Sequence, residues 1–160
     1  MQGKTVRESM VTLSHVMQPH DANPAGNIHG GVIMKMIDNA AGVVAFRHAR
    51  SNVVTASIER LDFLYPVHIG NLVTMVASLN RVGRSSMEIG VRVVSENMIT
   101  GEVHHTASAY LTFVALDEQG KPRPVPPLIL ENDEERRRHE NARRRTEQRA
   151  LEKSEQLKNR

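Results

Sequence analysis

The chain has 160 residues, 39% of them apolar, which predicts one globular domain rather than a disordered chain. Lysine and arginine number 21 against 18 aspartate and glutamate, and aromatic residues make up 3%, which argues against a dedicated nucleic-acid-binding protein. The chain contains no cysteine, which excludes disulfide bonds, thiolate metal ligands and a cysteine nucleophile.

The first residues carry charged side chains and lack the apolar segment of a secretory signal, and no later apolar run is long enough to span a membrane. We therefore expect a cytoplasmic protein without a membrane partner. Residues 10–18 alternate loosely between apolar and polar side chains and predict a short strand, which Pro19 ends. A turn-rich stretch over residues 20–27 follows.

Residues 32–46 form an almost wholly apolar run, interrupted by Lys35, Asp38 and Asn39. The length of this run and its lack of alternation predict a buried helix rather than a strand. A helix with so little polar surface has to be covered on most of its sides.

After residue 51 the pattern changes to the period of two that is typical of strands. It predicts four long strands, at residues 53–63, 72–82, 86–96 and 104–116. Apolar side chains that should share one face are Val54, Ala56 and Ile58 in the first of these, Met87, Ile89, Val91 and Val93 in the third, and Ala107, Ala109, Leu111 and Phe113 in the fourth. Short turns between the strands imply an antiparallel sheet, and one apolar helix laid across it gives an α+β fold with the sheet wrapped around the helix.

Residues 131–160 contain only four apolar side chains, Ala142, Ala150, Leu151 and Leu157. Glutamate and arginine recur there at spacings of three and four residues, which predicts a charged, solvated helix that is frayed or binds a partner. Four prolines between residues 122 and 127 end the compact region before it. We therefore divide the chain into a domain at residues 1–128 and a tail at residues 129–160.

Asp38 is the first candidate site residue, because an ionisable group within an apolar helix costs free energy unless it is paired or reaches water. On a helical period it shares a face with Met34, Gly42 and Gly31, and the small residues on that face leave room for a ligand. The pattern leaves two interpretations open. Asp38 is either a functional carboxylate or a structural one that pairs with a neighbour or faces solvent between packed subunits.

The glycine-rich turn over residues 23–31 is the second candidate, because a helix start presents free backbone N–H groups at the positive end of the helix dipole. Such a turn can hold an oxyanion or a phosphate, and a plain helix-starting loop is the alternative. The histidines lack the spacing of metal ligands, and no serine lies in a Gly-x-Ser-x-Gly elbow, so we expect neither a metal site nor a serine nucleophile.

The pattern Asn23-x-x-Gly26-x-x-His29-Gly30-Gly31, with Asp38 seven residues further on, resembles the acyl-CoA hydrolases of the hotdog fold. Later segments are similar to strands and a hairpin of the same family, namely Val54–Ser57 with Phe63 and Pro66, Val82–Met87, and Ala109–Leu116, and the closing Val125-Pro126 also fits. The resemblance covers residues 10–128. It implies a curved antiparallel sheet around one long helix, which the order of elements indicates independently.

The resemblance also implies an acyl-CoA thioesterase whose active site lies between two subunits. Asp38 of one chain would act as general base or as nucleophile at the thioester carbonyl, and Asn23 of the other chain would hold the water or the carbonyl. Backbone N–H groups of Gly30 and Gly31 would stabilise the oxyanion. His29 receives no catalytic role.

Positions that match the coenzyme A site of the family are Val54, Thr55, Ala56, Arg84, Ser85 and Ser86. The resemblance implies homodimers with a continuous sheet, assembled as trimers of dimers into a hexamer. It implies no cofactor beyond coenzyme A itself, which is part of the substrate and product, and no nucleic-acid partner. A non-catalytic acyl-CoA-binding sensor of the same fold is the alternative.

Overall fold

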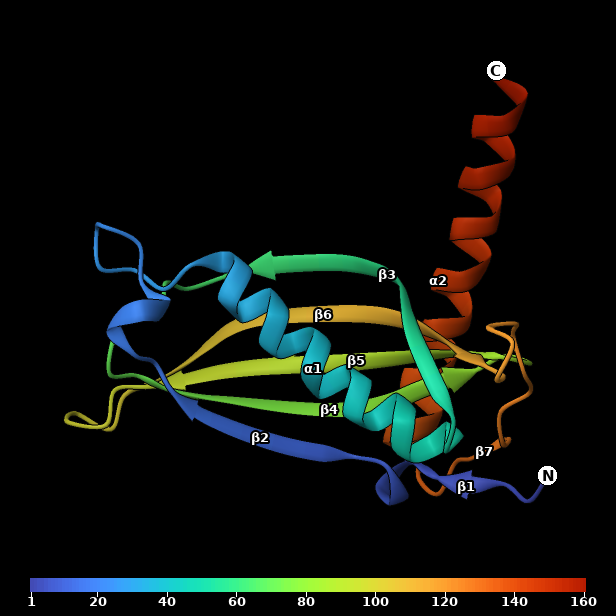
Figure 1. The fold of residues 1–160 in the computed structure, drawn as a ribbon, viewed down its shortest axis with the longest axis horizontal. Helices are drawn as coiled ribbons and strands as arrows, with labels where there is room; N and C mark the ends of the chain where they lie inside the picture. Colours follow the sequence, from blue (N-terminus) through green and yellow to red (C-terminus); the bar gives the residue numbers. More distant parts are fainter.

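A computed structural model describes all residues from 1 to 160. Five antiparallel strands form the main sheet, in the spatial order β2 (Val11–Val16), β4 (Leu72–Val82), β5 (Ser86–Glu96), β6 (Val103–Leu116) and β3 (Asn52–Phe63). Helix α1 (Gly30–Ala49) runs along one face of this sheet, and helix α2 (Asp133–Lys158) begins against the other face and then extends away from it (Figure 1). The short strands β1 (Lys4–Thr5) and β7 (Leu128–Ile129) pair in parallel as a separate small sheet. Short 3-10 helices occupy Val6–Glu8 and Pro19–Asp21.

This architecture confirms the predicted α+β hotdog fold with a charged C-terminal helix. The predicted strands agree with the observed ones to within two residues at either end. Helix α1 is longer than predicted, because Gly30 and Gly31 form its first turn and Arg47 and His48 its last. It ends at Arg50, which adopts the left-handed conformation (φ 53°) that commonly stops a helix.

The core lies between α1 and the sheet. Ile33, Ile37 and Val44 of the helix are completely or almost completely buried, and they face a sheet surface that includes Ile89 and Leu111. Burying an aliphatic side chain of this size stabilises a fold by roughly 1.5–3 kcal/mol. Apolar residues at three- and four-residue spacing therefore fix which side of the helix meets the sheet.

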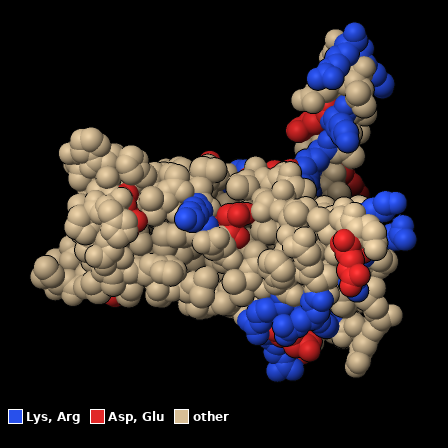
Figure 2. Space-filling model, viewed as in Figure 1, with Lys and Arg blue, Asp and Glu red and all other residues tan.

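The opposite side of α1 is uncovered within one chain. Exposed residues there are Met34, Val43 and Phe46, and Phe46 is 49% exposed. Figure 2, viewed from this side, shows few charged side chains over the helix and the neighbouring strand. The expectation that this helix is covered on most sides is therefore not met by a single chain.

One predicted strand face is wrong. The register of β3 against β6 shifts between Thr55 and Ser57, so Ala56 is the extra residue of a β-bulge. Ile58 lies opposite buried Leu111 and faces α1, whereas Val54 faces the other side of the sheet. A period of two cannot reveal a bulge, because one inserted residue reverses the alternation after it.

Helix α2 is more firmly attached than a solvated tail. Its first turn is capped by the Asn132 side chain, which accepts a hydrogen bond from the backbone N–H of Glu135 at 2.9 Å. Ala142 is completely buried against the sheet. Two ion pairs join the helix to strands, Arg145 to Glu88 at 2.8 Å and Arg149 to Glu59 at 3.0 Å. The remaining part extends from the body with exposed leucines at 151 and 157 (Figure 1).

Neither helix combines the length and the apolar character that crossing a membrane would require. The structure likewise contains no group of three or more histidine, aspartate or glutamate side chains placed to hold a metal ion. The predicted absence of a metal or further cofactor stays a prediction.

Candidate functional site

Asp38 lies in the middle of α1, where the helix passes β3. The Thr55 hydroxyl donates a hydrogen bond of 2.7 Å to Oδ1 of Asp38. No basic side chain pairs with this carboxylate, and its second oxygen has no hydrogen bond within the chain. Thr55 therefore orients the carboxylate and leaves one oxygen available beside the exposed apolar face.

Thr55 reaches Asp38 because of the strand register. It lies opposite Phe113, whose side chain belongs to the core, so both side chains point toward α1. The sequence placed Thr55 among coenzyme A contacts and missed this hydrogen bond. Only the position of the bulge at Ala56, which no sequence pattern marks, decides that Thr55 and Ile58 face the helix.

Asn23 stabilises the loop that precedes α1. Its Oδ1 accepts hydrogen bonds from the backbone N–H groups of Ala25 at 3.0 Å and Asn27 at 3.2 Å. Gly26 completes the turn at φ 87°, where a side chain would be strained. Two donors occupy the amide oxygen, whereas the NH2 group of Asn23 makes no hydrogen bond within the chain and stays available as a donor.

The backbone N–H groups of Gly30 and Gly31 have no acceptor within the chain, as expected at the first turn of a helix. The Phe63 ring packs against Gly30, where an added Cβ would lie 3.4 Å from it, while the space beside Gly31 is open. A largely apolar cavity of about 370 Å³ adjoins this helix start. Its lining is Asn27, Ile28, Gly30, Ile33, Phe63, Leu64, Tyr65, Pro66 and Val67. Phe63 and Pro66 are similar in sequence to a strand of the family that the chain resembles, but the sequence assigned neither them nor Tyr65 to a site.

One chain does not bring all of the predicted catalytic groups together. Seven and eight residues of helix separate Gly31 and Gly30 from Asp38, about 10–12 Å at the rise of an α-helix. A single carbonyl cannot lie within hydrogen-bond distance of groups that far apart. Asp38 and the helix start belong to two separate clusters within one chain.

The candidate coenzyme A residues lie at one end of the sheet. Val54 and Ser86 stand on either side of Val114, in register across three neighbouring strands. The backbone of the turn before Ser86 is held firmly, since the carbonyls of Arg84 and Ser85 accept hydrogen bonds from Val125 and Ala115 at 2.8 and 2.9 Å. The structure thus places the turn with Arg84 and the β3 segment with Val54 at the same end of the sheet, on either side of β6.

Known proteins share this chain's sequence pattern and fold. The sequence model of the Thioesterase superfamily matches residues 25–102 of this chain. The uncharacterized acyl-CoA thioester hydrolase YkhA of Bacillus subtilis is 41% identical over 89% of this chain and 83% of its own length. The chain belongs to the acyl-CoA thioester hydrolase family.

A mammalian member of the family, the cytosolic acyl coenzyme A thioester hydrolase of mouse, is 38% identical over 85% of this chain. The match spans only 36% of the mouse protein. Among solved structures, an apo-hexameric acyl-CoA thioesterase superposes with a TM-score of 0.91 at 39% identity, covering 95% of this chain and 97% of that one.

The acyl-CoA hydrolase of Staphylococcus aureus, solved with butyryl coenzyme A and coenzyme A, superposes with a TM-score of 0.87. It is 35% identical over 97% of this chain and 94% of its own. Structures have also been solved of three variants of that enzyme, in which alanine replaces one asparagine, one aspartate or one threonine. In that enzyme the aspartate stands 15 residues after the asparagine and the threonine 17 after the aspartate, the spacings that separate Asn23, Asp38 and Thr55 here.

Proposed function

We propose that this protein hydrolyses acyl-CoA thioesters to a carboxylic acid and coenzyme A. The observation that carries the proposal is the Asp38 carboxylate, which Thr55 orients at 2.7 Å and which keeps one oxygen free. In the proposed reaction Asp38 removes a proton from water as the water oxygen bonds to the acyl carbon. The carbon–sulfur bond then breaks, and the proton passes to the thiolate of coenzyme A.

Asn23 and the helix start supply the complementary charge. Since the amide oxygen of Asn23 is used within its own loop, its NH2 group is suited to donate to the thioester carbonyl rather than to accept a proton from water. The free N–H groups of Gly30 and Gly31 lie at the positive end of the α1 dipole and would stabilise the oxyanion. These donors act on a charge that develops in the transition state.

The active site is proposed to form between two copies of the chain. The helix length between Gly31 and Asp38 keeps the two clusters apart, and the uncovered face with Met34 and Phe46 lies beside Asp38. A second copy packed on that face would bring its own Asn23 and helix start to the first copy's Asp38. The hexameric relative supports a trimer of such dimers.

The remaining candidate residues are proposed to bind the coenzyme A part of the substrate. Val54, Ala56, Arg84, Ser85 and Ser86 lie at the sheet end next to Thr55, and Arg84 supplies a cation without an acidic partner. The thioester would then reach Asp38 past Thr55. The mouse relative is described as cytosolic, which supports the proposal of a cytoplasmic protein.

The Asp38→Asn variant tests the proposal. Asparagine keeps an oxygen that accepts the Thr55 hydrogen bond but cannot take a proton, so we expect thiol release to fall about a hundredfold or more while the melting temperature is unchanged. The measurement is thiol release from a panel of acyl-CoAs from acetyl to palmitoyl. Near-normal turnover by the folded variant would remove Asp38 from the chemistry. Saturable acyl-CoA binding without turnover by the parent would favour the sensor instead.

A further inference from the structure

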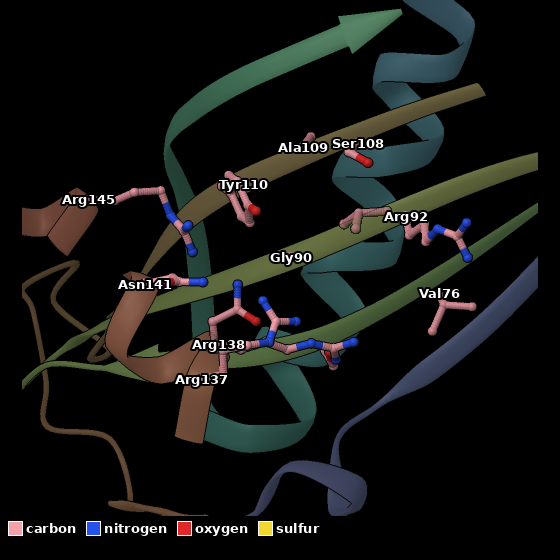
Figure 3. Close-up of a pocket in the computed structure, with 13 residues that line it drawn as sticks. Val76, Gly90, Arg92, Ser108, Ala109, Tyr110, Arg137, Arg138, Asn141 and Arg145 are labelled. Atoms are coloured by element: carbon pink, nitrogen blue, oxygen red, sulfur yellow. The ribbon is translucent and has the colours of Figure 1, made fainter. Parts of the chain in front are cut away.

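A second cavity lies on the opposite face of the sheet from Asp38, between the first half of α2 and strands β4, β5 and β6. Its volume is about 360 Å³, a size typical of small-ligand sites. Arg137, Arg138 and Arg145 of α2 form one wall, and Arg92 of β5 stands at the far side in the view of Figure 3. The sheet separates this α2 groove from the proposed active site.

The α2 groove carries an excess of positive charge. Arg137 and Arg138 share a single carboxylate, Glu134, at 2.5 and 3.0 Å. Arg145 pairs with Glu88 and lies 3.6 Å over the Tyr110 ring. Arg92 has no acidic partner. Four guanidinium groups thus face two carboxylates, and guanidinium groups are well suited to bind phosphate oxygens in pairs.

The floor of the α2 groove contains polar groups that lack partners. Ser78 is 6% exposed and Asn80 is 4% exposed, yet neither side chain makes a hydrogen bond within the chain. Gly90 on the neighbouring strand leaves room for the Asn80 amide, since a Cβ there would lie 3.0 Å from its nitrogen. The buried side-chain atoms without a partner are His48 Nδ1 and Glu88 Oε2, so the polar atoms of Ser78 and Asn80 are open to the groove and available to an occupant that can bond them.

We propose that the α2 groove binds a multiply charged phosphate group. Arg92 and Arg138 would neutralise its charge from opposite sides, and the Ser78 hydroxyl and the Asn80 amide would donate hydrogen bonds from the floor. Free phosphorylated metabolites and the phosphates of coenzyme A share this chemistry. The site is independent of thioester hydrolysis, because no residue of the α2 groove takes part in the proposed reaction.

Isothermal titration calorimetry with inorganic pyrophosphate at constant ionic strength tests the site. We expect saturable binding of one pyrophosphate per chain, weakened at least tenfold in Arg92→Gln and in Arg138→Gln. Arg144→Gln is the matched control, because Arg144 lies on the same helix outside the groove with its side chain 71% exposed. Its affinity should stay within about twofold of the parent, since a distant exposed charge is screened.

Competition by coenzyme A identifies the source of the phosphate. If coenzyme A displaces pyrophosphate from the parent, the groove takes the phosphates of coenzyme A; if it does not, the groove takes a free anion. Absence of saturable binding would overturn the proposal, as would an equal loss in the Arg144→Gln control. A third result would also overturn the proposal: the parent binds no pyrophosphate, and the groove variants change the oligomeric state in sedimentation. The groove would then be a subunit contact.

Discussion

At the residue scale, the hydrogen bond from Thr55 to Asp38 links strand β3 to helix α1. This hydrogen bond is exposed to solvent, where water competes for both side chains. It therefore adds little to the stability of the fold, roughly 0.5–1.5 kcal/mol. Its value is geometric. A carboxylate that rotates freely spends less time with its open oxygen directed at one point.

Replacing Thr55 with valine should separate orientation from stability. Valine has nearly the volume of threonine but no hydroxyl, so Asp38 loses its only partner. We expect kcat to fall about tenfold with the melting temperature changed by no more than a few degrees. Thr55→Ser, which restores the hydroxyl, should recover most of kcat. A Thr55→Val protein with parental kcat would show that Asp38 needs no positioning residue.

His48 gives stability a pH dependence. This side chain is fully buried in the last turn of α1, and its Nε2 lies 2.8 Å from the Pro126 carbonyl oxygen. Nδ1 is buried without a partner. Burial holds the pKa of His48 below its usual range, and the nearby Lys4 lowers it further, against an opposing effect of the Pro126 carbonyl.

Because the pKa of His48 is lower in the folded chain than in the unfolded one, the unfolded state takes up a proton first as the pH falls. The stability due to neutral His48 is therefore complete above about pH 6.5 and is lost as the pH falls through the folded pKa. Urea unfolding between pH 8 and pH 5 should show this loss. His48→Gln, which retains a donor for Pro126, should show a shallower loss, and an equally steep one would assign the effect to other groups.

At the element scale, α2 shows what a charge pattern reveals and what it conceals. Its glutamate and arginine spacing predicts a helix, and a helix is present. Its docking depends on Ala142, a small residue whose contact with the sheet no periodicity indicates. The long strands were predictable because each buries one face and so largely keeps a period of two. That period is interrupted at the Ala56 bulge and at three further register shifts.

A bulky charge at Ala142 should detach this helix. Ala142→Glu places a long carboxylate where no space exists, which we expect to cost about 1–3 kcal/mol and to free α2 from the sheet. Limited proteolysis should then cut within residues 133–158 at least tenfold faster. Ala150→Glu is the matched control, because Ala150 is exposed on the same helix. Equal cleavage of both variants would mean that Ala142 does not anchor the helix.

At the scale of the whole molecule, the candidate site is the part that the sequence predicted least completely. Asn23, Gly30 and Asp38 could be chosen from sequence because their residue types and spacing are distinctive. Their arrangement could not, since the helix length keeps Gly30 and Asp38 apart within one chain, and the proposed site needs a partner surface as well. The apolar residues that mark this surface, such as Phe46, have the same pattern as core residues until the fold leaves them exposed.

Mixing two inactive variants tests the two-subunit site. Asp38→Asn and Asn23→Ala should each be inactive alone, but a hybrid dimer contains one site with both native residues. After the two proteins are unfolded and refolded together, about a quarter of parental activity should return, since half of the dimers are hybrids with one intact site each. Thiol release is the measurement, with each variant refolded alone as control. No recovery in a mixture that sedimentation shows to be dimeric would place both residues in one chain's site.

The length of α1 between Gly31 and Asp38 also determines when the protein can work. In the proposed two-subunit arrangement, a single chain has a complete core yet supplies only part of each reaction centre. Its specific activity should therefore rise with its own concentration and fade on dilution below the dimer dissociation constant. Hydrolysis by this protein would then begin only once its copies are abundant enough to pair.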